Sequence, residues 1–350
     1  MPQVSASTLV TMGKSIFVAA GAPDDIAHDV AHSLVETNLS GHDSHGIIRV
    51  MLYVDMIRNR DLLPSARPQL RQGSGAIASL DCRRGFGQIG AQVGTAMAAE
   101  LAHEHGIGCV ALENVNHVGR LGEYAESLAR KRMVGIVLTS GTVVRVSVAP
   151  WGGREPLMST NPMAWALPAG TGDTPFVLDY ATAVVANGKV QVALSEGRAF
   201  PEGMLLDRDG NPTTDPASFL NGGMLLPFGT YKGHGLSLMM ELIPGILCGF
   251  SPVSSTRFRS GNPTLILALN IEAFAEPELF REQTQEFLER IKAVAPADGF
   301  DEVLLPGEKE QRSKAERSRT GIPLPRIVWN ELCDLAAAYG VDVPEDPVAA

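Results

Sequence analysis

The sequence predicts an α+β fold, in which helical ends flank a mixed centre of strands and helices. Residues 1–60 carry apolar side chains at helical spacing, and residues 313–340 are charged at first and then show the same spacing. From residue 76 onward, short apolar runs alternate with longer amphipathic stretches. We therefore expect the N- and C-terminal helices to pack together beside a domain that contains the strands.

The predicted elements follow one another with clear punctuation. A helix begins behind Pro23, with Asp24 and Asp25 in its first turn, and ends at Gly41. Residues 62–75 contain two prolines and form the crossing into the central region. Strands are expected at 76–80, 109–112, 135–138, 163–167, 176–178 and 264–269. Helices are expected around 89–101, at 121–132, at 235–242 with a resumption toward 247, and at 277–294, whereas 197–223 is loop-rich.

Two domains are expected. Residues 1–74 together with 310–350 make a helical domain, and residues 75–309 make the sheet-containing domain for cofactor and substrate. A smaller loop-rich subdomain near 190–250 is expected within the second domain. At 350 residues the chain is long enough to bury the cores that this arrangement needs.

Composition and charge exclude several classes of protein. The formal net charge is −10 at pH 7, which argues against nucleic acid as a partner because an acidic surface repels phosphates. The most apolar long stretch, 235–250, contains Glu241 and Pro244 and is too short to span a membrane. The four cysteines lack metal-site spacing and the N-terminus lacks a secretory pattern, so we expect a cytoplasmic protein.

The stretch 41–49 (GHDSHGIIR) concentrates chemical groups between two helices. The imidazole of His45 titrates near neutrality, so it is suited to give a proton to a carbonyl oxygen during hydride transfer and to retake it. Arg49 follows about one helical turn later on the same face, and its fork matches the carboxylate of a 2-oxo or 2-hydroxy acid. Ser44 can orient the imidazole or the substrate oxygen. The alternative is a helix cap with a solvated histidine.

Residues 85–90 (GFGQIG) match the GxGxxG pattern of dinucleotide-binding folds. They lie between a predicted strand and a predicted helix, and Glu113 follows about twenty residues on, where a ribose-binding acid is expected. In that interpretation the pyrophosphate lies at the helix N-terminus. Residues 81–84, however, separate the strand from the first glycine, which disagrees with the pattern. A glycine-rich turn that caps the helix explains the same residues equally well.

Six motifs in order resemble the malate/L-lactate dehydrogenase family of the second type, a non-Rossmann group of oxidoreductases. The resemblance covers nearly the whole chain. The motifs are GHDSHG at 41–46, NHVGRLG at 116–122, TNP at 160–162, LDYAT at 178–182, YKGHG at 231–235 and LPGE at 305–308. The resemblance implies a large mixed sheet of mostly antiparallel strands. It also implies that residues 85–90 form a turn and that Glu113 binds no ribose.

The resemblance assigns a set of cofactor-binding positions. They are Ser140, Val177, Leu178, Asp179, Tyr180, Ala181, Tyr231, Lys232, Gly307, Glu308 and Lys309. The positive charge of Lys232 suits a phosphate, and the glycines that follow it let a ligand approach the backbone. Asp179 is placed to accept a hydrogen bond from a hydroxyl or an amide, and the alternative is a helix or turn cap. The expected cofactor is NAD, with NADP as the alternative.

Catalytic and substrate positions are implied in the same way. The resemblance leaves open whether His45 or His117 transfers the proton. We favour His45, with His117 polarising or holding the substrate oxygen and Ser44 completing this site. The residues expected to bind the substrate are Arg49, Arg120, Tyr53 and Thr160. Arg120 favours a second anionic group on the substrate if it faces the pocket, and otherwise it is a surface arginine. The histidines lack the spacing of a zinc site, so no metal is expected.

These residues predict an oxidoreductase that transfers a hydride between NAD(P)(H) and a small 2-hydroxy or 2-oxo carboxylic acid similar to malate or lactate. A reductase of cyclic imino acids, such as piperideine- or pyrroline-2-carboxylate, is the first alternative. A catalytically silent nucleotide-binding protein is an alternative of another class. The family resemblance also implies a homodimer with the cofactor near the subunit interface.

Overall fold

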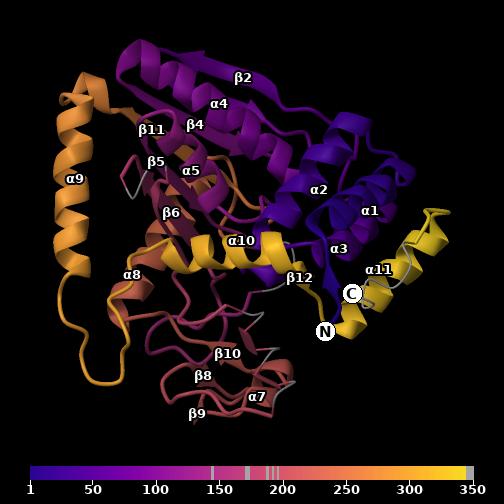
Figure 1. The fold of residues 1–350 in the computed structure, drawn as a ribbon. Helices are drawn as coiled ribbons and strands as arrows, with labels where there is room; N and C mark the ends of the chain where they lie inside the picture. The colour runs from indigo at the N-terminus through magenta and orange to yellow at the C-terminus, as the bar shows by residue number, and fades with distance from the viewer. Residues whose placement is uncertain (143–145, 170–173, 187–188, 191–192, 195–196, 344–350) are drawn as a thin grey trace.

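The computed structural model describes residues 1–142, 146–169, 174–186, 189–190, 193–194 and 197–343 (Figure 1). Its largest sheet has seven strands in the order β2-β3-β4-β11-β5-β6-β7. These strands are β2 (Gln69–Ser74), β3 (Ile77–Asp81), β4 (Ile107–Glu113), β5 (Met133–Thr139), β6 (Pro162–Leu167), β7 (Phe176–Ala181) and β11 (Thr264–Asn270). The pair β3 and β4 is parallel, and the other pairs are antiparallel. The predicted α+β fold with a mixed, mostly antiparallel sheet is confirmed.

Strand β11 lies at the centre of the large sheet although it comes late in the chain. It pairs with β4 on one side and with β5 on the other. Its sequence TLILALN is largely apolar, and Ile266 and Ala268 are fully buried. Helix α4 (Gly87–His105) packs on β4 and β11, and α5 (Gly122–Arg130) packs on β5 and β6. The loop that links β4 to α5 is thereby fixed at one end of the sheet.

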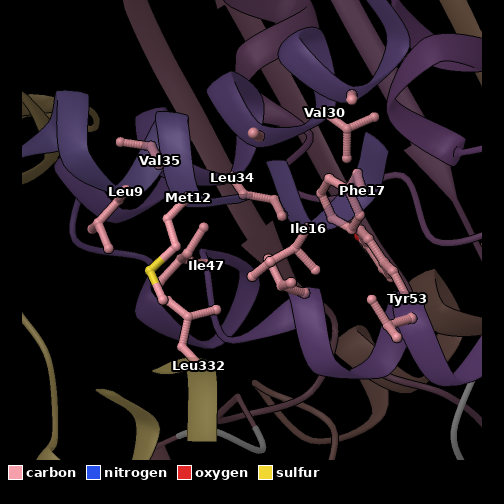
Figure 2. Packing of buried hydrophobic residues seen from close by; sticks show 14 of the residues in the cluster. Leu9, Met12, Ile16, Phe17, Val30, Leu34, Val35, Ile47, Tyr53 and Leu332 are labelled. Atoms are coloured by element: carbon pink, nitrogen blue, oxygen red, sulfur yellow. The ribbon is translucent and has the colours of Figure 1, made fainter. Parts of the chain in front are cut away.

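A helical core combines both ends of the chain. Its helices are α1 (Ala6–Ala19), α2 (Asp24–Leu39), α3 (Arg49–Arg58) and α11 (Arg326–Ala338). Leu9, Ile16, Phe17 and Leu332 belong to one apolar cluster (Figure 2). Beside it, β1 (Gln3–Val4) pairs with β12 (Ile322–Pro323). The predicted packing of the terminal helices is confirmed. The domain division stays a prediction, and its last residues, 344–350, lie outside the described residues.

A smaller unit lies beside the large sheet, within the region predicted to be rich in loops (Figure 1). Its elements are β8 (Leu205–Leu206), β9 (Pro212–Thr213), β10 (Met224–Leu225) and α7 (Ala217–Leu220). Val148, Phe219 and Leu225 pack in its apolar cluster. Helix α8 (Tyr231–Met240) follows and continues into a π-helix, η2 (Glu241–Leu247), which packs on β5 and β11.

Two further helices complete the fold. Helix α9 (Pro277–Lys292) follows a 3-10 turn, η3 (Ile271–Ala273), and stands along one edge of the molecule (Figure 1). Helix α10 (Glu308–Thr320) packs against α2. Within the described ranges, none of the helices combines the length and apolar character needed to cross a membrane.

Three elements differ from the sequence prediction. Residues 69–74 were expected to belong to a crossing, whereas they form strand β2. Every residue of β2 is exposed, so the strand lacks the alternating apolar side chains from which a strand is predicted, and it is held by its backbone pairing with β3. The predicted boundary at residue 74 falls between these two paired strands. Helix α10 starts before residue 313, where the charged segment was expected to begin. Its sequence is charged throughout and lacks the apolar spacing from which a helix is predicted. Helix α8 starts at Tyr231 rather than at Gly235, and η2 continues through Pro244.

Candidate active site

The loop 41–48 lies at the C-terminal end of α2 and is fixed there by a buried amide. It contains a 3-10 turn, η1 (Asp43–His45), which precedes α3. A side chain at Gly46 has no room, because its Cβ would overlap Oδ1 of Asn38. The same Oδ1 accepts a hydrogen bond from the backbone N of Ile47 at 2.7 Å. Asn38 therefore sets the course of the loop, although the sequence held no signal for this role.

His45 and His117 lie side by side. Their ring centroids are 5.4 Å apart and their planes are inclined by 25°. Nδ1 of His45 lies 2.9 Å from Oγ of Ser44, and Nδ1 of His117 lies 2.6 Å from Oη of Tyr53. His117 comes from the loop after β4, so the fold brings together the two histidines that the motifs singled out.

A chain of hydrogen bonds favours one tautomer of His117. Nε2 of Gln88, a fully buried side chain, donates to Oη of Tyr53 at 2.7 Å. The phenol therefore uses its own proton to donate to Nδ1 of His117. A neutral imidazole held in this way carries its proton on Nε2, where it can donate to a substrate oxygen. Gln88 looked like any other polar helix residue in the sequence and was not predicted.

The electrostatic surroundings keep both imidazoles neutral near pH 7. Burial, assisted by the positive charge of Arg49, lowers the pKa of His45 to about 3. The same two causes hold the pKa of His117 well below its ordinary value. Burial raises the pKa of Tyr53, so the phenol keeps its proton. A carboxylate bound at Arg49 would offset the positive charge there and raise the pKa of both histidines.

Arg49 is adjacent to the histidine loop, at the start of α3. Its Nε donates to the backbone O of Ser44 at 2.7 Å. Burial lowers the pKa of the guanidinium, yet an arginine remains charged in proteins. Among the described residues, no hydrogen bond occupies its two terminal nitrogens. The site differs from the prediction in one respect: His45 belongs to η1 and Arg49 to α3, so they do not share one helical face.

Arg120 and Asp179 form a pair that is largely shielded from solvent. Nε of Arg120 lies 3.7 Å from Oδ2 of Asp179, and this oxygen also accepts a hydrogen bond from N of Gly122 at 2.7 Å. The carboxylate thus caps the first residue of α5, which was the alternative considered for Asp179. Arg120 is only 9% exposed, so its interpretation as a surface arginine is wrong.

A cavity of about 690 Å³ lies between α2, α5, β7 and α10. Its wall includes Arg120, Val177 and Gly307. Gly307 has a φ of +89°, and a Cβ there would lie 3.1 Å from the O of Val177, so two predicted cofactor segments meet here. Nε of Arg120 is buried and, among the residues that the structure describes, lacks a hydrogen-bond partner, which leaves a donor for an anionic ligand. Ligand clefts commonly measure roughly 300–1,000 Å³. The residues of this wall fit a nicotinamide cofactor.

Three other predicted cofactor residues lie around α8 and η2. Ser140 is only 1% exposed, and a Cβ at Gly245 in η2 would lie 3.0 Å from its Oγ. Tyr231 and Lys232 are exposed at the start of α8. Thr160, expected at the substrate, accepts hydrogen bonds through its backbone O from Thr182. Among the described residues, no hydrogen bond joins Thr160 to the histidine pair.

The remaining predicted cofactor residues lie on β7 and at the start of α10. Leu178, Tyr180 and Ala181 are partly buried along β7. The carboxylate of Glu308 accepts hydrogen bonds from Nζ of Lys292 at 2.6 Å and from N of Leu305 at 3.0 Å. Lys309 is exposed. Through these contacts with Lys292 and Leu305, the Glu308 carboxylate fixes the start of α10.

Residues 85–90 form the end of a turn and the first turn of α4, in agreement with the turn that the resemblance implied. A Cβ at Gly87 would overlap the backbone O of Asn116 and of His117, so the chain itself occupies the space that a pyrophosphate would need. Glu113 accepts a hydrogen bond from Oγ of Ser79 at 2.6 Å and pairs with Arg71. The glycines of the pattern serve close packing.

Known proteins with similar sequences and folds place this site in a family. A family model described as malate/L-lactate dehydrogenase matches residues 4–333. Hydroxycarboxylate dehydrogenase B from Escherichia coli (strain K12) is 37% identical over 99% of this chain and 96% of its own length. The structure of sulfolactate dehydrogenase from Methanocaldococcus jannaschii matches with a TM-score of 0.88 at 33% identity, covering 98% of each chain. The structure of delta1-piperideine-2-carboxylate reductase from Pseudomonas syringae gives 0.82 at 29% identity, covering 96% of this chain and 100% of that one. The chain belongs to the malate/L-lactate dehydrogenase family and is an oxidoreductase of hydroxy acids.

Proposed function

We propose that this enzyme oxidises small 2-hydroxy carboxylic acids, and reduces the matching 2-oxo acids, with His45 as the group that moves the proton. The observation that carries this proposal is the stacked pair of His45 and His117 with Arg49 beside it. A proton acceptor and a carboxylate-binding fork lie together, as a 2-hydroxy acid requires.

Each side chain of the site has its own role. Neutral His45 accepts the proton of the hydroxyl group during oxidation and returns it to the carbonyl oxygen during reduction. His117 donates a hydrogen bond from Nε2 to the same oxygen, and Tyr53 keeps His117 in the required tautomer. Arg49 binds the carboxylate, and Ser44 orients His45. A nicotinamide held by the proposed cofactor residues would supply the hydride donor or acceptor.

We place part of the cofactor in the cavity between α2, α5, β7 and α10, and we propose NAD in preference to NADP. Lys314 on the wall pairs with Glu36 at 2.5 Å, and Arg130 pairs with Glu126 at 2.6 Å. Because these cations are already neutralised, a 2′-phosphate would gain little from them. The carboxylates of Glu36 and Glu126 on the same wall are instead suited to accept hydrogen bonds from ribose hydroxyls.

Reduction of a cyclic imino acid is the second candidate, which the likeness to piperideine-2-carboxylate reductase favours. An imine that is already protonated needs no donor for an oxygen, so this activity would depend little on His45. The likeness to that reductase is weaker, at 29% identity, than the 37% shared with hydroxycarboxylate dehydrogenase B. We therefore prefer the hydroxy acid.

A homodimer in the cytoplasm is the proposed form of the enzyme. Leu238, Leu242 and Ile246 recur every four residues along α8 and η2 and are 43%, 51% and 50% exposed. An apolar surface of this kind suits contact with a second copy. The buried thiols of Cys82 and Cys248 fit a reducing compartment.

Turnover assays test the proposed function. Lactate, malate, 2-hydroxyglutarate and phenyllactate are offered with NAD and with NADP, and piperideine-2-carboxylate is offered with each reduced cofactor. We expect oxidation of at least one hydroxy acid, faster with NAD. Turnover of the imine alone would favour the second candidate. Binding of NADH without turnover of any compound would contradict both.

A further inference from the structure

A two-point ion pair ties the histidine loop to helix α10. Nη1 and Nη2 of Arg317 donate to the two carboxylate oxygens of Asp43 at 2.6 Å and 3.0 Å. Nη1 also donates to the backbone O of Asn38 at 2.5 Å. The side chain of Arg317 is 17% exposed, so solvent screens this contact only in part. A bidentate contact of this kind fixes orientation as well as distance.

Asp43 is the first residue of the turn that contains Ser44 and His45. Its Oδ1 also accepts a hydrogen bond from Nδ2 of Asn38 at 2.7 Å. On the other side of the turn, Oδ1 of Asn38 accepts the hydrogen bond from Ile47. The turn is thus held both before and after His45, and Arg317 supplies an anchor that comes from outside α2.

Helix α10 connects this anchor to the cavity. Gly307, at its N-terminal end, lies against Val177 in the cavity wall, and Arg317 lies in its last turn. Between these ends, Oγ of Ser313 donates to the backbone O of Leu39 at 2.9 Å. The N-terminal end has its own attachment through Glu308, so the loss of Arg317 leaves that end in place.

We propose that Arg317 and Asp43 are positioning residues that hold His45 in line with His117. This proposal rests on the proposed role of His45. Because Nε of Arg49 is bonded to the backbone O of Ser44, a displaced turn also moves the carboxylate-binding fork. Loss of the ion pair therefore lowers kcat and raises the KM for the acid, while the KM for the cofactor stays constant.

The kinetic test compares Arg317→Gln with Arg319→Gln, a control that removes the same charge from an exposed position in the last turn of α10. We expect Arg317→Gln to lower kcat at least about tenfold, with unchanged KM for NADH, and Arg319→Gln to match the wild type. Arg317→Lys keeps the charge and recovers part of the loss. Adding Asp43→Asn to Arg317→Gln causes little further loss, because the two residues act as one unit. Equal kcat values for Arg317→Gln and Arg319→Gln would overturn the proposal.

Hydrogen–deuterium exchange of residues 42–48 gives a readout that needs no substrate. Faster exchange confined to this segment in Arg317→Gln supports the positioning role. Unchanged exchange there, or equally faster exchange throughout α1 and α11, overturns it. If the wild type oxidises no hydroxy acid while the segment still loses protection in the variant, the proposed function fails and the anchoring role of Arg317 stands.

Discussion

The loop 41–48 and the segment 85–90 both contain glycines and both lead into a helix, and of these two only the loop 41–48 carries proposed reacting groups. In the loop 41–48, Gly46 packs on the amide of Asn38, and His45 remains free to meet His117. In the segment 85–90, Gly85 and Gly87 pack against the protein's own backbone, and Gly90 packs against the side chain of Cys82. A glycine pattern therefore shows only that something approaches the backbone closely, and the environment decides whether that neighbour is a ligand or the chain itself.

The turn at 85–90 nevertheless supports the other one. Nδ2 of Asn116 donates to the backbone O of Arg84 at 2.9 Å and of Gly85 at 3.1 Å, which ties this turn to the loop that carries His117. Gln88, inside the same pattern, donates to Tyr53. One turn presents His45, the proposed proton-transferring group, and the other helps to hold His117 in place.

The largest expected effect separates the two histidines. His45→Ala removes the proton acceptor, so we expect kcat to fall by roughly 10³-fold to 10⁴-fold at pH 7. His117→Ala removes a hydrogen bond to the substrate oxygen and should cost about 10²-fold. Steady-state kinetics with the best hydroxy acid measures both. A greater loss of kcat for His117→Ala would assign the proton transfer to His117 instead of His45, and the roles of the two histidine-bearing loops would be reversed.

A smaller effect is expected at Tyr53 in α3, which joins Gln88 to His117. Tyr53→Phe frees Nδ1 of His117 and leaves the buried Nε2 of Gln88 without its acceptor. We expect kcat to fall about tenfold and the free energy of unfolding to fall by about 1–3 kcal/mol. Tyr124→Phe is the control, since it breaks the buried hydrogen bond from Oη to the O of Val118 and leaves the Tyr53 contact intact. Kinetics and urea unfolding of both variants would reveal equal kcat values if Tyr53 had no such role.

The pH dependence of stability tests the lowered pKa of His45. The pKa of His45 is about 3 in the folded protein, against an ordinary value of 6.5. Between these values the unfolded chain binds a proton that the folded chain excludes, so the free energy of unfolding falls as the pH is lowered from 6.5 toward 3. His45→Asn should make this decline shallower, and His28→Asn, at an exposed position of α2, is the control. Parallel pH profiles for the wild type and His45→Asn in urea unfolding would rule out a lowered pKa for His45 in the folded protein.

The sequence was enough to select the proposed reacting groups, because His45, Arg49 and His117 are reactive side chains in glycine-punctuated segments. Their supports could not be predicted. Gln88 and Arg317 gain their roles from partners that are distant in sequence, and alone they look like ordinary polar helix residues. The same limit applies to the fold. The central strand β11 could be predicted from its apolar side chains, whereas β2 is exposed and is defined by its backbone pairing with β3, which leaves no pattern in the sequence.

The smallest expected effect decides between the two interpretations of the turn at 85–90. If this turn bound a dinucleotide, Glu113 would hold a ribose hydroxyl, and Glu113→Gln would raise the KM for NADH severalfold. In the structure its carboxylate serves Ser79 and Arg71 instead, and Arg71 is 61% exposed, so the ion pair contributes at most about 1 kcal/mol. We expect a loss of stability of that size in urea unfolding and an unchanged KM for NADH. A raised KM for NADH with an unchanged KM for the acid would restore the dinucleotide interpretation, and the two turns would then both bind ligands.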